Sequence, residues 1–145
     1  MRFVLDTNIL VRLVEPSHPQ HDKVGAAMRT LRMRENAFYV FMQNISEFWN
    51  VCTRPTESNG IGLPISETNL HLARFEQLFS VLPDTSEVYQ NWRELVVAHS
   101  VSGVKVHDAK IVAGMMAHRI DQLLTLNIAD FKRYGEISAI SPEDI

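Results

Sequence analysis

The sequence FVLDTNIL, residues 3–10, decides the fold expected for this chain. Its first residues are apolar and suit a buried strand, which we expect over residues 2–5. The triplet Asp6-Thr7-Asn8 follows directly, and all three are residue types that favour helix starts. The stretch therefore predicts a core strand that ends in polar side chains, followed by a short helix that Pro16 terminates.

Strand-like and helix-like segments alternate along the rest of the chain. Apolar residues spaced i, i+3, i+4, i+7 predict helices, and the helix that opens at Ser66 should turn Leu72, Phe75 and Phe79 inward. Further strands are expected over residues 37–42, 80–82, 123–125 and 137–140. This alternation predicts an α/β fold, a three-layer α/β/α sandwich around a central, mostly parallel sheet. We expect one domain covering residues 1–145.

Composition and charge limit the classes of protein to which this chain can belong. The chain is 46% hydrophobic and 21% charged, as in ordinary globular domains, and no apolar run approaches the roughly 20 residues of a membrane span. Cys52 is the only cysteine, so an internal disulfide is excluded, which fits a reducing cytoplasm. The net charge of −3 argues against a protein that holds long nucleic acid by charge alone.

Four acidic residues stand where strand-like runs give way to helix starts: Asp6, Glu47, Asp108 and Asp130. In an open parallel sheet, ligands bind beyond the carboxyl ends of the strands, so these side chains should meet in one pocket. Two carboxylates about 4 Å apart repel by roughly 4 kcal/mol at an effective dielectric near 20. Several of them together would have to bind protons or a cation, and oxygen ligands suit Mg²⁺ or Mn²⁺.

Each acid also has an ordinary structural interpretation. Asp6 can cap the helix after the first strand, and Glu47 stands three residues after Asn44, as in a capping box. Asp108 and Asp130 fall in first helical turns, where a carboxylate gains about 0.3–1 kcal/mol from the helix dipole. Taken singly, capping explains each acid better than metal binding does, so the metal hypothesis depends on the four together. No His and Cys cluster has the spacing of a zinc site.

Four segments carry these acids: FVLDTNIL (3–10), NISEF (44–48), VHDAKIVA (106–113) and LTLNIADF (124–131). They resemble the four motifs of PIN-domain ribonucleases, and the VapC-like toxins of toxin–antitoxin pairs are the most similar group. Their order and spacing agree over essentially the whole chain. The resemblance implies a PIN-like α/β/α sandwich and metal-dependent cleavage of RNA phosphodiester bonds.

The resemblance also assigns roles to residues. Asp6, Glu47 and Asp108 match the three central acids, which would be catalytic and hold one Mg²⁺ or Mn²⁺. At the fourth position this sequence departs from the family, because Asn127 stands where Asp is common. The remaining supporting positions are Asp130, one helical turn after Asn127, and Asn8 and Thr125, which match residues that bond or orient the acids.

An RNA substrate would need cations near the acids, and the resemblance implies protein partners. Basic residues near the acids are candidates for contacts to RNA phosphates: Arg12, Arg54, Lys105 and Lys110. A VapC-like toxin would form a homodimer and bind a small antitoxin protein that covers the site.

Two alternatives remain open at this level. The chain could be a PIN-like RNA-binding or regulatory module with weak catalysis, which Asn127 and the acidic balance favour. It could also be a phosphotransfer domain with Asp6 as nucleophile. Haloacid-dehalogenase-like enzymes use a second Asp two residues later, where this chain has Asn8.

Overall fold

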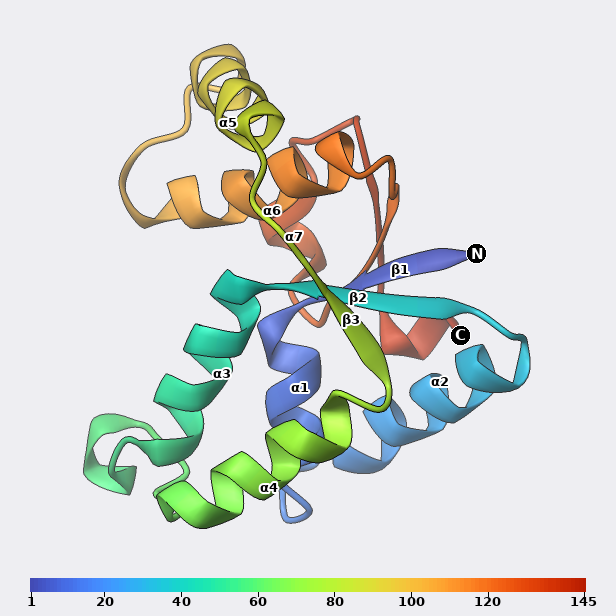
Figure 1. Cartoon of the computed structure of the whole chain (residues 1–145), viewed down its shortest axis with the longest axis vertical. Coiled ribbons are helices and arrows are strands. Elements are labelled where there is room, and N and C mark those ends of the chain that lie inside the picture. The colour runs from blue at the N-terminus through green and yellow to red at the C-terminus, as the bar shows by residue number, and fades with distance from the viewer.

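A computed structural model describes residues 1–145 and contains one sheet of five strands, in the order β3-β2-β1-β4-β5. Every neighbouring pair is parallel, so the predicted parallel sheet is correct (Figure 1). The strands are β1 (Arg2–Leu5), β2 (Ala37–Phe41), β3 (Phe79–Leu82), β4 (Gln122–Leu124) and β5 (Ser138–Ile140).

Seven α-helices connect the strands. They are α1 (Thr7–Leu13), α2 (His21–Met33), α3 (Met42–Thr53), α4 (Ile65–Phe75), α5 (Ser86–Ala98), α6 (Val106–Ala117) and α7 (Ile128–Phe131). Three short 3₁₀ helices complete the chain, over Thr56–Ser58, Gly103–Lys105 and Pro142–Asp144. No helix combines the length and the apolar character that a membrane crossing requires.

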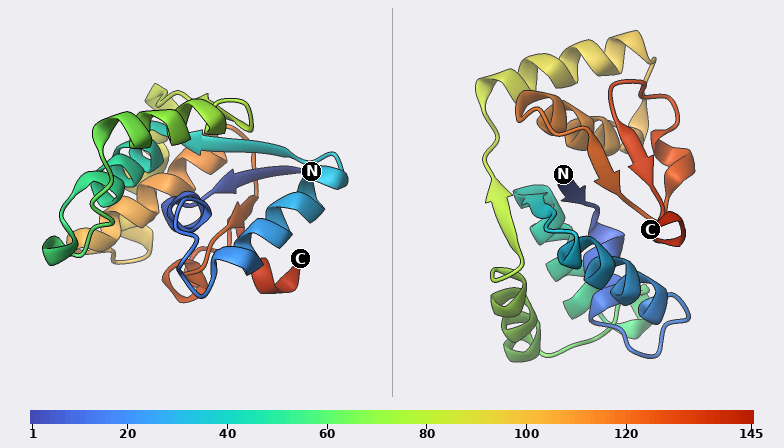
Figure 2. Two further views of the ribbon diagram at one scale, coloured as in Figure 1. Left: turned by 90° about the horizontal axis from the view of Figure 1, so that it is seen from below. Right: turned by 90° about the vertical axis from the view of Figure 1, so that its right-hand side faces the viewer.

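The helices cover both faces of the sheet, which confirms the three-layer sandwich (Figures 1 and 2). Successive strand residues point to opposite faces, and β1 shows this directly. Phe3 and Leu5 pack into a core with α1 to α4, whereas Val4 packs into a second core with α5, α6 and α7. A strand buried on both sides explains why the first segment of the sequence is an uninterrupted apolar run.

The direction in which strands are added reverses beside β1. The chain first builds outward through β2 and β3, and then returns by α5 and α6 to place β4 on the other side of β1. Such a reversal leaves a crevice beyond the strand ends. Asp6 follows β1 at this place, and its backbone N–H donates to the carbonyl of Leu124 at the end of β4 (3.0 Å).

Three local predictions were wrong. Phe79 lies in β3, because α4 ends at Phe75 and the turn over residues 76–78 separates the two elements. Glu47 does not stand at a helix start, since α3 begins at Met42 directly after β2 and places Glu47 in its second turn. Asp108 follows a 3₁₀ helix rather than a strand-like run.

Candidate functional site

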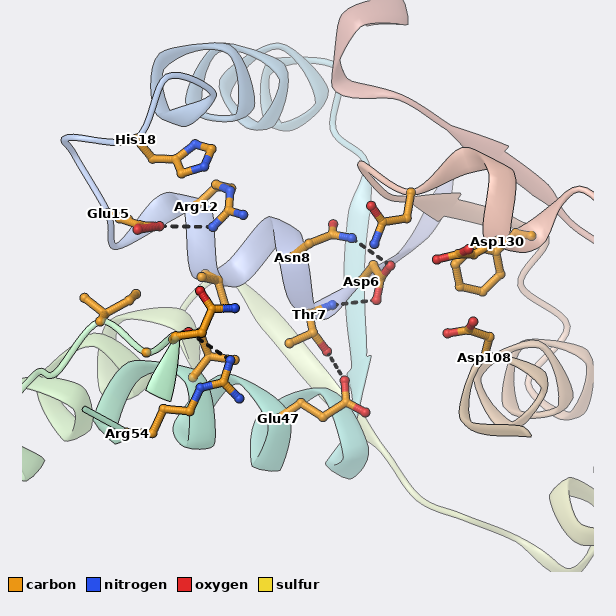
Figure 3. Close-up of a pocket in the computed structure, with 17 residues that line it drawn as sticks. Asp6, Thr7, Asn8, Arg12, Glu15, His18, Glu47, Arg54, Asp108 and Asp130 are labelled. Carbon is orange, nitrogen blue, oxygen red and sulfur yellow. Dashed lines mark hydrogen bonds and ion pairs between the residues drawn. The ribbon is translucent and has the colours of Figure 1, made fainter. Parts of the chain in front are cut away.

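All four acids line one open cavity of about 470 Å³ at the reversal point of the sheet (Figure 3). Asp6 comes from the end of β1, Glu47 from α3, Asp108 from the first turn of α6 and Asp130 from α7. Figure 3 shows Asp6 between Glu47 on one side and Asp108 and Asp130 on the other. The structure therefore brings together acidic residues that are up to 124 positions apart in the sequence.

Hydrogen bonds fix the Asp6 carboxylate in place. One oxygen, Oδ1, accepts from the backbone N–H of Thr7 (2.8 Å), so Asp6 does cap α1. The other, Oδ2, accepts from Thr125 Oγ1 (2.7 Å) and from Asn8 Nδ2 (3.1 Å). Burial raises the pKa of Asp6 and the charge of Glu47 raises it further, while the hydrogen bonds lower it. The net rise means that the cost of burying the Asp6 carboxylate, with the nearby charge of Glu47, exceeds what its hydrogen bonds offset.

Asn8 and Thr125 join the start of α1 to the turn after β4. Asn8 Oδ1 accepts from the backbone N–H of Leu126 (3.1 Å), and its Nδ2 also donates to Thr125 Oγ1 (3.3 Å). Thr125 is fully buried and its Oγ1 accepts from the backbone N–H of Asn127 (3.0 Å). These bonds lock Asp6 against β4, so its position depends on both halves of the sheet.

Glu47 is held by residues that the sequence analysis did not assign to the site. Its Oε2 accepts from Thr7 Oγ1 (2.7 Å) and its Oε1 from Gln43 Nε2 (3.0 Å). Asn44 Nδ2 donates to Thr7 Oγ1 (3.2 Å), and Asn44 Oδ1 accepts from the N–H of Phe41, which caps α3. Asn44 is fully buried within the apolar stripe of α3, and such a buried amide is the signal in the sequence that could have revealed this network.

Asp108 differs from the other acids because its carboxylate accepts no hydrogen bond within the chain. Burial raises its pKa to about 6, and the negative charges of Asp130, Asp6 and Glu47 contribute to the rise. Lys105 lowers the pKa of Asp108, since its Nζ lies 4.0 Å from Asp108 Oδ2. The Asp108 oxygens are therefore free to bind an external cation.

The fourth position of the site holds two candidates. Asn127 precedes α7 and lines the cavity, but its amide forms no hydrogen bond that would fix it. Asp130 also lines the cavity, and its Oδ1 forms an ion pair with Lys105 and accepts a hydrogen bond from Lys105 Nζ (2.7 Å). Lys105 thus offsets the charge that Asp130 adds to the site.

The basic residues divide into those near the acids and one that is not. Arg12 and Arg54 line the same cavity, and Lys105 contacts two of its acids. Lys110 lies elsewhere, paired with Asp84 (2.8 Å) beside a different cavity. Two residues after Asp108, it projects from another side of α6. The expectation that Lys110 flanks the acids in space is therefore wrong.

The acidic side chains of the cavity are the possible ligands of the divalent ion that the motifs imply. No three His, Cys, Asp or Glu side chains are close enough together to hold a metal ion between them. Asp6, Glu47 and Asp108 share a cavity without forming a direct three-ligand cluster. Mg²⁺ commonly binds through one or two carboxylates and keeps several waters. The free Asp108 carboxylate, the fixed Asp6 carboxylate and their raised pKa values fit such a hydrated ion.

The chain is similar to known proteins in sequence pattern and in fold. The sequence model of the PIN domain matches residues 3–137. A search of curated proteins by sequence gives no match.

Solved structures of similar fold cover nearly the whole chain. VapBC2 from Rickettsia felis bound to a DNA fragment from their promoter has a TM-score of 0.75 at 17% identity, covering 97% of this chain and 98% of that one. VapBC-1 from nontypeable Haemophilus influenzae has a TM-score of 0.72 at 13% identity, covering 99% of both chains. VapC20 from Mycobacterium tuberculosis, a toxin that cleaves the sarcin-ricin loop, has a TM-score of 0.59 at 15% identity, covering 83% and 86%. At these identities the similarity shows the fold.

Proposed function

The chain belongs to the PIN domain family, and on that premise we propose that it is a metal-dependent endoribonuclease. The observation that carries the proposal is the single cavity into which Asp6, Glu47, Asp108 and Asp130 all project. The raised pKa values of Asp6 and Asp108, together with an Asp108 carboxylate that accepts no hydrogen bond, support a cation-binding site rather than a set of helix caps.

Asp6 and Asp108 would hold one Mg²⁺ or Mn²⁺. When bound, the ion lowers the pKa of a coordinated water and stabilises negative charge on phosphate oxygens. Asp6 suits this role because three donors fix its orientation. Asp108 suits it because its oxygens accept no hydrogen bond in the chain, and Lys105 Nζ approaches only to 4.0 Å.

Glu47 would position and deprotonate the attacking water. Each of its oxygens accepts one hydrogen bond, from Thr7 or Gln43, and so can accept another from a water, and Glu47 lines the cavity. The water oxygen forms a bond to phosphorus as the bond to the 3′ oxygen breaks, and the water proton passes to Glu47. The 3′ oxygen takes a proton from solvent, which leaves a 5′-phosphate and a 3′-hydroxyl.

The biological role proposed is that of the toxin in a VapBC-type pair. Support comes from the fold shared with VapBC complexes over almost the full length of both chains. The proposal includes a homodimer, a small antitoxin that covers the acidic cavity, and action on RNA in the cytoplasm. The absence of a three-ligand metal group and the neutral Asn127 favour a second candidate, a PIN-like RNA-binding module with weak catalysis.

Cleavage of single-stranded RNA by the purified chain tests the proposal. We expect cleavage with Mg²⁺ or Mn²⁺, none with EDTA, and none in Asp6→Asn or Asp108→Asn. Asp84→Asn is the matched control, because Asp84 pairs with Lys110 away from the cavity. RNA that is bound but never cleaved would favour the binding module, and cleavage that persists in Asp6→Asn would contradict the assignment.

A further inference from the structure

The cavity has a second limb that the proposed chemistry does not use. Beyond the acids it continues between α1 and the loop after α3, where its lining includes Arg12, His18, Arg54 and Gly60 (Figure 3). Within this limb Arg12 forms an ion pair with Glu15 (3.0 Å). Arg54 lines the limb without any carboxylate partner. The second limb therefore contains a cation whose charge the protein itself does not offset.

The Arg54 guanidinium uses only one of its five N–H donors. Its Nη2 donates to the carbonyl of Asn59 (2.9 Å), and Nη1 donates to nothing in the chain. Arg54 Nε is buried without a partner, and it is the only buried side-chain nitrogen or oxygen in the structure in that condition. A buried N–H left unpaired costs about 1–3 kcal/mol. A group retained at such a cost calls for an explanation beyond packing.

The loop over residues 55–63 is shaped around Arg54. The carbonyl of Arg54 accepts from the backbone N–H of Gly62 (3.0 Å), and Asn59 adopts a left-handed conformation (φ 61°) that turns its carbonyl to the guanidinium. A Cβ at Gly60 would overlap the Arg54 carbonyl oxygen and Cγ, so only glycine allows this approach. The loop thus holds Arg54 by its backbone and leaves the charged end unneutralised.

An anion is the ligand that this arrangement suits, and a phosphate is the anion that the neighbouring acids imply. A guanidinium presents adjacent N–H groups that match phosphate oxygens in pairs. The acids and Arg54 line one continuous cavity, so a polyanion cleaved at the acids would extend a neighbouring phosphate towards Arg54. We propose that Arg54 binds a backbone phosphate of the RNA that flanks the phosphate being cleaved, an inference that rests on the proposed ribonuclease function.

Binding of a labelled oligouridine 12-mer, measured by fluorescence anisotropy, tests this subsite. All variants carry Asp108→Asn to prevent cleavage. We expect Arg54→Gln to weaken binding about tenfold and to reduce the slope of log affinity against log salt by about 0.7, as for the loss of one phosphate contact. Arg93→Gln is the matched control, since Arg93 is exposed on α5 beside a different cavity and should change neither quantity.

Two further arms keep the result interpretable. If Arg54→Gln fails to fold, Arg54→Lys is compared with Arg93→Lys, and a several-fold loss at position 54 alone is expected because Lys lacks the paired donors. The Arg54 Nε–H signal in ¹⁵N NMR should shift on adding the RNA and not on adding a glutamate-rich peptide. Equal affinities of the two glutamine variants, or a shift of similar size with the peptide, overturn the proposal.

Failure of this inference is distinguishable from failure of the proposed function. If the wild-type chain cleaves RNA but Arg54→Gln binds RNA as tightly as Arg93→Gln, only the proposed phosphate subsite is refuted. If the wild-type chain neither binds nor cleaves RNA, both the subsite and the proposed ribonuclease function are refuted.

Discussion

Thr7 Oγ1 donates a 2.7 Å hydrogen bond to Glu47 Oε2 and so joins two helices through residues that lie 40 positions apart in the sequence. Thr7 opens α1 directly after Asp6, and Glu47 lies in the second turn of α3. The same hydroxyl accepts from the buried Asn44 amide (3.2 Å). The relative positions of Asp6 and Glu47 therefore depend on one side chain that belongs to neither acid.

Thr7→Val should damage both stability and activity. Valine keeps the shape of threonine but removes the donor to Glu47 and the acceptor for Asn44, which leaves a buried amide N–H unpaired. We expect the free energy of unfolding to fall by about 1–3 kcal/mol, measured by urea denaturation, and RNA cleavage to fall as Glu47 loses its orientation. Thr53→Val is the control, because Thr53 bonds only the carbonyl of Trp49 at the far end of α3. Equal activity of the two variants would argue against a positioning role for Thr7.

Stability without metal should depend on pH through Asp108. Its pKa is raised from 3.8 to about 6, so between these values the folded chain binds more protons than the unfolded chain. The contribution of this group to the free energy of unfolding is therefore fully present below about pH 3.8 and is lost as the pH rises through about 6. Asp108→Asn removes the contribution, so its stability advantage over the wild type in EDTA should grow between pH 4.5 and 7.5. A difference that stays constant over this range, measured by urea unfolding, would contradict the shift.

Lys105→Met should tighten the binding of divalent ions. Lys105 places a positive charge 2.7 Å from Asp130 and 4.0 Å from Asp108, where it repels a divalent ion that binds to these carboxylates. Its removal frees both carboxylates, and we expect Mn²⁺ affinity to rise by about tenfold or less, since the side chain is partly exposed and solvent screens it. Calorimetric titration measures the change, with Lys132→Met as an exposed control. Unchanged or weaker binding in Lys105→Met would show that Lys105 supports the site instead.

The sequence was most informative where local pattern and burial coincide. The strand at residues 2–5 and the parallel sandwich were both predicted correctly, because a strand buried on both faces leaves an apolar run and the alternation of strands and helices is visible in the sequence. Phe79 was misassigned since α4 and β3 are separated by only a three-residue turn, and an apolar residue fits either pattern.

The site itself was only partly predictable. The acids could be found because each stands in a recognisable segment, and family membership supports their grouping. The bonds from Asn44 to Thr7 and from Thr7 to Glu47 depend on how α1 packs against α3, which no local spacing specifies. Lys110 was misplaced because proximity in sequence to Asp108 says nothing of the direction in which the side chain leaves α6.

Titration of the purified chain with Mn²⁺ tests most directly whether Asp6 and Asp108 share one cation. We predict a single site per chain in the wild type and in Asp84→Asn, and loss of that site in both Asp6→Asn and Asp108→Asn at unchanged folding by circular dichroism. Mn²⁺ binding of wild-type strength in either of the last two variants would contradict a shared metal site at the end of β1.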